Sequence, residues 1–150
     1  TLVGQNMGAN EMLRAEQSVM KTVKYNVIFM VTVSVIFFFM GDFLVGFFTN
    51  ESEIKTIATN ALHIMAVGFI FYGIGMVMIN AFNGAGDTWT PTWVNLCGFW
   101  LFQIPLAYFL SKYFGMGPKG VFISIPVTET LITIVAFILF KKGKWKTVKV

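Results

Sequence analysis

One carboxylic acid, Glu129, lies in the middle of a long apolar stretch that runs from Val121 to Phe140. Pro126 comes three positions before it and Thr133 four positions after it. Because a carboxyl group is costly to place in hydrocarbon, acids at such positions commonly mark ion or proton pathways. Glu129 is therefore a candidate for carrying a proton or another coupling ion. The alternative is a structural, protonated acid hydrogen-bonded to threonine hydroxyls or to the carbonyl that Pro126 frees.

A second set of candidate residues has the spacing of one helical face. Tyr72, Met76 and Asn80 recur every four residues, and the same face continues through Met65, Phe69 and Asn83. Methionine and aromatic side chains adapt to organic molecules of varied shape, and amides add hydrogen bonds. This face suits a substrate cavity. The alternative is that it only packs against a neighbouring helix.

Two further amides, Asn95 and Gln103, are eight residues apart, with Phe99 midway between them. Helical spacing puts all three on one face, and Pro105 should kink the helix just beyond them. Unpaired amides are costly in hydrocarbon, so we expect Asn95 and Gln103 to meet Asn80 in the interior of a bundle.

The remaining reactive side chains do not make a catalytic set. The chain has one histidine, His63, and one cysteine, Cys97, which lies inside an apolar stretch. No nucleophile, base and orienting group can be assembled from these, and no metal-binding spacing or phosphate-binding glycine motif is present. The sequence therefore favours a protein that is not an enzyme and has no catalytic residues, metal site or cofactor.

Long apolar helices must position these residues. Four stretches run from about Tyr25 to Phe48, Ala58 to Phe82, Trp93 to Phe114 and Val121 to Phe140. Each has the roughly 20 residues that a helix needs to cross about 30 Å of hydrocarbon. Hydrophobic residues make up 56% of the 150 residues and charged residues 12%, against roughly 25% charged in soluble domains. We predict an all-α, polytopic transmembrane bundle of four complete spanning helices, preceded by the end of another helix in Thr1–Ala9.

The segments between the spans have their own signals. Residues 1–24 are predicted to hold the end of a helix and then a cytoplasmic connection. Its part from Ala9 to Lys24 has the pattern of an amphipathic helix lying at the membrane surface or of a solvated linker helix. Between the second and third spans, Gly84 and Gly86 should end one helix, while Asp87 or Thr88 caps the next. This predicts a tight hairpin.

The lysines set the orientation. With the basic tail, residues 141–150, in the cytoplasm, eight basic side chains lie inside and three outside. The opposite orientation reverses these numbers, and cytoplasmic loops are enriched in Lys and Arg. We therefore expect a multi-pass protein of the cell membrane with a cytoplasmic C-terminus. The flanking positions of the lysines indicate the lipid bilayer rather than nucleic acid as partner.

Four segments, in this order, resemble the multidrug and toxic compound extrusion (MATE) transporters: Thr1–Ala9 (TLVGQNMGA), Ala81–Pro91 (AFNGAGDTWTP), Gln103–Tyr108 (QIPLAY) and Phe140–Lys146 (FKKGKWK). The resemblance covers essentially the whole chain. It implies a twelve-helix, cation-coupled antiporter of two six-helix bundles. Residues 1–150 would then correspond to the end of helix 8 through helix 12, in the C-terminal bundle.

The resemblance also implies function and partners. Such transporters exchange H⁺ or Na⁺ for small organic, commonly cationic substrates, so the N-terminal bundle of the same transporter would be a partner. Some family members carry an acid in helix 10, where this chain reads Gly73-Ile74-Gly75-Met76. This departure leaves Glu129, or acids of the N-terminal bundle, as candidates for coupling.

Two other functions fit the same architecture. A lipid-linked oligosaccharide flippase of the wider superfamily would favour a cationic cavity, and no Lys or Arg lies in mid-span here. A membrane scaffold without transport activity would need no polar cavity, which the amide and Met/aromatic faces argue against.

Overall fold

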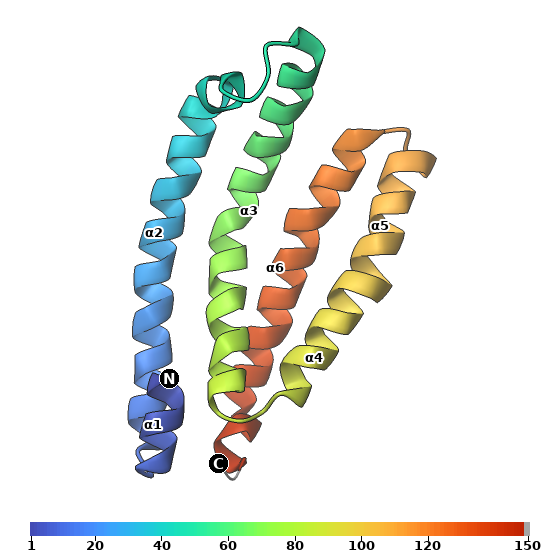
Figure 1. Cartoon of the computed structure of the whole chain (residues 1–150). Coiled ribbons are helices and arrows are strands. Elements are labelled where there is room, and N and C mark those ends of the chain that lie inside the picture. Colours follow the sequence, from blue (N-terminus) through green and yellow to red (C-terminus); the bar gives the residue numbers. More distant parts are fainter. Residues whose placement is uncertain (149–150) are drawn as a thin grey trace.

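The computed structural model describes residues 1–148, and all regular secondary structure within them is helical (Figure 1). A short helix α1 (Leu2–Gly8) is followed by α2 (Met12–Gly46) and α3 (Ser52–Gly84). A third long helix covers Trp89–Tyr113, and α6 (Pro118–Lys142) is the fourth. All four are long and apolar enough to cross a membrane. The predicted all-α bundle of four spanning helices is therefore confirmed.

Helix α2 corrects one detail of the sequence prediction. The segment from Ala9 to Lys24 is not a separate helix, because its residues from Met12 onward continue into the first span without a break. A turn at Asn10, whose φ is 59°, separates α1 from α2. At 1.5 Å per residue, the 35 residues of α2 exceed the roughly 30 Å of a bilayer core. Because Arg14, Glu16, Lys21 and Lys24 all lie in its first turns, we place the excess length outside the hydrocarbon at that end.

The third span changes its helical winding along its length. It begins as α4 (Trp89–Asn95), continues through the π-helical segment η1 (Leu96–Gln103) and α5 (Ile104–Tyr108), and ends in a second π-helical segment, η2 (Phe109–Tyr113). The ring of Pro105 clashes with a regular α-helical turn and provides no amide hydrogen. The wider turns before and after it let the helix pass through this position.

Helix α3 is the centre of the bundle, with α2 packed along one side and α6 along the other (Figure 1). Two hydroxyl groups bond to its backbone from these neighbours. Ser34 of α2 donates to the Ala66 carbonyl at 2.5 Å, and Thr133 of α6 donates to the Phe71 carbonyl at 2.6 Å. Interhelical bonds of this kind contribute to packing where no water competes.

Both termini and the α3–α4 connection lie at the same end of the bundle (Figure 1). In that connection Gly86 has a φ of 82°, and the Asp87 carboxylate accepts hydrogen bonds from the Thr90 amide at 3.0 Å and hydroxyl at 2.6 Å. The predicted hairpin and its Asp87 cap are thus present. Gly84, by contrast, keeps a helical backbone as the last residue of α3.

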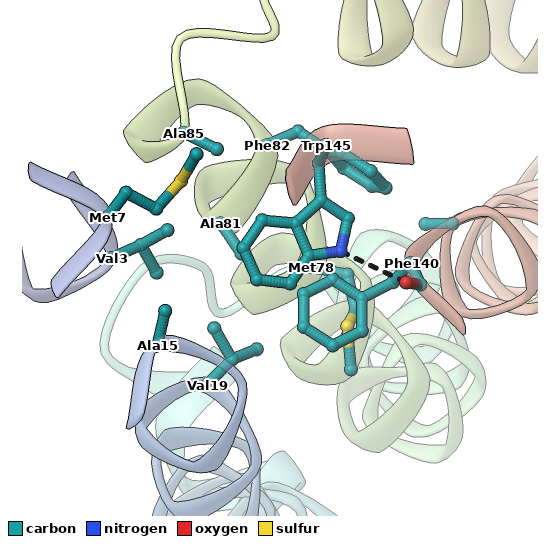
Figure 2. Close-up of a cluster of buried hydrophobic side chains, with 11 residues drawn as sticks. Val3, Met7, Ala15, Val19, Met78, Ala81, Phe82, Ala85, Phe140 and Trp145 are labelled. Atoms are coloured by element: carbon teal, nitrogen blue, oxygen red, sulfur yellow. Dashed lines mark hydrogen bonds between the residues drawn. The ribbon is translucent and has the colours of Figure 1, made fainter. Parts of the chain in front are cut away.

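A buried cluster closes this end (Figure 2). Trp145, in the short 3₁₀ turn η3 (Lys144–Thr147), is fully buried and stacks on Phe140 with ring centroids 4.9 Å apart. The cluster joins α1, α2, α3 and α6 through small and apolar side chains: Val3, Met7, Ala15, Val19, Met78, Ala81, Phe82, Ala85 and Ala136. Trp145, in the turn after α6, is therefore part of the core.

Candidate functional site

The Glu129 side chain lines a pocket between α3 and α6. The pocket has a volume of about 170 Å³, and α6 contributes Ile125, Pro126 and Glu129 to its wall. The α3 side of the wall is formed by one face of that helix: Met65, Gly68, Phe69 and Tyr72. Three members of the predicted Met/aromatic face thus lie beside the one mid-span carboxyl group.

Close contact between α3 and α6 positions this pocket. A methyl group built on Gly68 would lie 2.5 Å from Cβ of Pro126. Helix α3 therefore has no room for a side chain at the point where it packs against Pro126. The lack of a side chain at Gly68 lets the helix carrying Glu129 approach the helix carrying Tyr72. The glycine and the proline therefore set the width of the pocket.

The threonines near Glu129 bond elsewhere. The Thr130 hydroxyl donates to the Pro126 carbonyl at 2.7 Å, and the Thr133 hydroxyl donates to the Phe71 carbonyl. Within residues 1–148 no hydrogen bond to the Glu129 carboxyl group is found. Within residues 1–148, the hydroxyl groups of Thr130 and Thr133 therefore donate to backbone carbonyls and not to Glu129.

A half-buried carboxyl group beside aromatic rings is a suitable environment for a cation. A carboxylate supplies negative charge, and Phe69 and Tyr72, which line the same pocket, are side chains whose ring faces attract cations. The same carboxyl group can instead take up and release a proton. The pocket therefore fits either an ion or a proton, and its aromatic wall also fits an organic ammonium group.

Two further members of the predicted α3 face line a different cavity, while Asn83 is exposed. Met76 and Asn80 border a groove of about 420 Å³ between α1, α2 and α3. The Asn80 amide donates to the Met76 carbonyl at 2.9 Å. Asn26 of α2 lies in this groove too, and its Oδ1 atom is buried without a hydrogen-bond partner within residues 1–148. The sequence prediction did not select Asn26, although it is one of few polar residues in its span.

The structure does not join the three predicted amides in one hydrogen-bonded group. Asn95 and Gln103 lie on the third span, both half-buried, while Asn80 is in the groove beside α1 and α2. The Oε1 atom of Gln103 is buried and has no partner in the described residues. Because the π-helical segment η1 ends at Gln103, its wider turns shift the side chains away from regular spacing.

Two polar residues at the opposite end have structural partners. Asp42 accepts a hydrogen bond from the Thr59 hydroxyl at 3.0 Å. The His63 ring lies 4.9 Å from the ring of Phe38 and packs beside Gly41. These contacts join α2 to α3.

This molecule has four helices of membrane-spanning length and a carboxyl group in a pocket between two of them. Its class is therefore that of a multi-pass membrane protein. The sequence model of the MatE family matches residues 1–109. The chain is 26% identical over 121 residues to a Thermotoga maritima protein described as a probable multidrug resistance protein, NorM. That match covers 81% of this chain and 26% of the relative.

The fold also has a solved counterpart. The crystal structure of the Vibrio cholerae MATE transporter VcmN in its bent form is similar with a TM-score of 0.84 and 20% sequence identity. The match covers 94% of this chain and 32% of that one. The chain belongs to the MatE family, and it spans between a quarter and a third of the length of these two proteins.

Proposed function

We propose that this chain is part of a cation-coupled antiporter that exports drugs or other small organic cations across the cell membrane in exchange for H⁺ or Na⁺. Membership of the MatE family supports the transporter class, and the name of the NorM relative supports drugs as substrates. The transported molecules would be held by a complete transporter, in which the N-terminal six-helix bundle faces this one.

The Glu129 pocket is the observation that carries the proposal. Its carboxyl group lies at mid-span, the neighbouring threonine hydroxyls donate elsewhere, and Tyr72 and Phe69 line the same pocket. A group that is free of structural hydrogen bonds can exchange its ligand during a cycle. We propose that Glu129 binds the coupling ion and that Tyr72 and Met76 contact the substrate, with Asn80, Asn95 and Gln103 as polar neighbours of the transport path.

Transport by the full-length protein in proteoliposomes tests this role. Glu129→Gln keeps the shape of the side chain but can neither titrate nor carry a negative charge. We expect this variant to retain substrate binding and to lose efflux driven by an imposed H⁺ or Na⁺ gradient. Exposed Glu51 provides the matched control, and Glu51→Gln should transport normally.

Full gradient-driven efflux by the Glu129→Gln variant would reject the coupling role. A second measurement separates coupling from folding. The Glu129→Gln variant should unfold at the same temperature as the unchanged protein, because no hydrogen bond to Glu129 is seen within residues 1–148. Loss of transport together with early unfolding would instead indicate a structural acid.

The proposed orientation has its own test. In a Cys97→Ser background, single cysteines at Glu51 and Lys119 should react with an impermeant maleimide in intact cells, and a cysteine at Lys144 should not. All three positions are exposed in the structure. Lys144 is a better reporter than Lys146, whose ammonium group lies 2.6 Å from the Glu16 carboxylate. Labelling at Lys144 but not at Lys119 would place the C-terminus outside.

A further inference from the structure

The two ends of the bundle differ sharply in charge. Within residues 1–148, the end with both termini carries seven basic and three acidic side chains, and the opposite end carries three of each. The basic side chains are Arg14, Lys21, Lys24, Lys141, Lys142, Lys144 and Lys146, and the acids are Glu11, Glu16 and Asp87. One end of the molecule is therefore strongly positive, and the other is balanced.

Two of the three acids at the positive end already have partners. Glu16 holds Lys146 at 2.6 Å and Lys141 at 3.5 Å, and the hydrogen bond from Lys146 lowers the pKa of the Glu16 carboxyl group. Asp87 caps α4 through Thr90. The exposed lysines Lys21, Lys24, Lys142 and Lys144, which we call the lysine rim, have no acidic partner in the described residues.

Aromatic side chains mark the depth at which these lysines lie. Tyr25 directly follows Lys24 and is 71% exposed, while Trp89 and Trp93, at the same end of the bundle, are 72% and 56% exposed. Exposed Tyr and Trp side chains are typical of the boundary between hydrocarbon and headgroups. The lysine rim therefore lies at the level of the lipid headgroups.

The surface beside Lys21 has a shallow, open depression whose lining residues all belong to α2. A depression of about 430 Å³ is lined by Leu13, Glu16, Gln17, Met20 and Lys21. Its apolar residues can contact the upper part of an acyl chain. Because Glu16 also bonds to Lys141 and Lys146, the end of α6 is held beside this depression.

The backbone that carries Lys144 and Lys146 is held against the bundle. Gly143 ends the helix with a φ of 72°, and the buried Trp145 ring lies between Lys144 and Lys146 in the chain. The Trp145 indole donates to the Phe140 carbonyl at 3.0 Å. Binding a ligand to these lysines would therefore cost less conformational entropy of the protein than binding it to a disordered tail.

We propose that the lysine rim and the adjoining depression bind the phosphate-bearing headgroup of an anionic phospholipid. Charge complementarity selects this partner, since four ammonium groups without acidic partners lie at headgroup depth. The inference concerns lipid binding and does not depend on the transported substrate or the coupling ion. Each lysine near an anionic surface should raise the affinity for the lipid roughly fivefold.

The full-length protein in detergent provides the test. Phosphatidylglycerol should raise its Tm and remain bound in native mass spectrometry, while phosphatidylcholine should do neither. The variant with Lys21→Gln, Lys142→Gln and Lys144→Gln should lose both effects and should keep its Tm in phosphatidylcholine. It leaves Lys141 and Lys146, and hence the Glu16 contacts, unchanged. The effect on the unchanged protein should weaken as salt is added, because the interacting charges are exposed.

The matched control variant neutralises the three lysines at the opposite end of the bundle. Lys55→Gln, Lys112→Gln and Lys119→Gln together should leave phosphatidylglycerol binding intact. Equal loss in this control, or full binding by the rim variant, would contradict the proposal. Soluble glycerol phosphate alone should not raise the Tm, and an equal rise would indicate a site for a free phosphate compound.

If the triple variant unfolds in phosphatidylcholine, the single changes Lys142→Gln and Lys144→Gln provide the test. Each should bind phosphatidylglycerol roughly fivefold more weakly than the unchanged protein.

Discussion

Replacing Trp145 by alanine is expected to lower the free energy of unfolding by about 3–5 kcal/mol, the usual loss for a fully buried large aromatic residue. Trp145 has no exposed surface, and its ring stacks on Phe140 with only 13° between the ring planes. The change would leave a cavity among Val3, Val19 and Phe82 and so loosen the contact between α6 and the first three helices. Chemical unfolding of the purified full-length protein in detergent measures the loss.

Two variants show where that loss arises. Trp145→Phe keeps an aromatic ring but loses the indole hydrogen bond, and we expect a smaller loss of about 1 kcal/mol from that bond. The Phe140 carbonyl keeps a second donor, the Gly143 amide, at 3.1 Å. Trp89→Ala, at a position 72% exposed, should change stability by less than about 0.5 kcal/mol. Equal losses for Trp145→Ala and Trp89→Ala would show that Trp145 is not part of the core.

The four spans and the grouping of the chain ends were predictable because they depend on local properties. A run of about 20 apolar residues has few options other than a spanning helix. An even number of such helices returns the chain to the side on which it began, so Arg14, Asp87 and Lys144 had to lie at one end. The Asp87 cap was predictable for the same reason, since it involves only residues three positions apart.

The amide positions were harder to predict because they depend on how the helices turn against each other. Regular spacing put Asn95 and Gln103 on the face expected to meet Asn80, but the π-helical turns from Leu96 to Gln103 alter that spacing. No sequence signal marks a π turn reliably. The groove that holds Asn80 and Asn26 also depends on the close approach of α2 to Gly73, which is a property of the packed bundle.

The role of Trp145 was also missed, although a signal for it exists. A glycine directly after a lysine-rich helix end commonly adopts the left-handed conformation that reverses the chain. Gly143 does so here, and a large apolar residue two positions later can then fold back onto the helix. The lysines on both sides of Trp145 made the segment resemble a solvated tail.

Replacing Gly68 by alanine is expected to destabilise the protein by about 1–3 kcal/mol, the usual cost of overpacking. Alanine alone would favour a helix over glycine, so helix propensity predicts the opposite sign. The added methyl group would lie 2.5 Å from Cβ and 3.1 Å from Cα of Pro126. A proline ring cannot rotate away, so α3 and α6 must separate. Because both residues line the Glu129 pocket, gradient-driven transport should fall as well.

A complementary exchange separates this contact from a general effect of alanine. Gly8 has no atom within 4 Å of an added methyl group, so Gly8→Ala should be neutral or slightly stabilising. Adding Pro126→Gly to Gly68→Ala removes the opposing Cβ atom, and the double variant should recover part of the loss. The recovery is measured as a coupling energy in a double-mutant cycle of unfolding free energies. A coupling energy of zero would mean that the approach of α3 to α6 at Gly68 does not limit stability, and the width of the Glu129 pocket would then depend on other contacts.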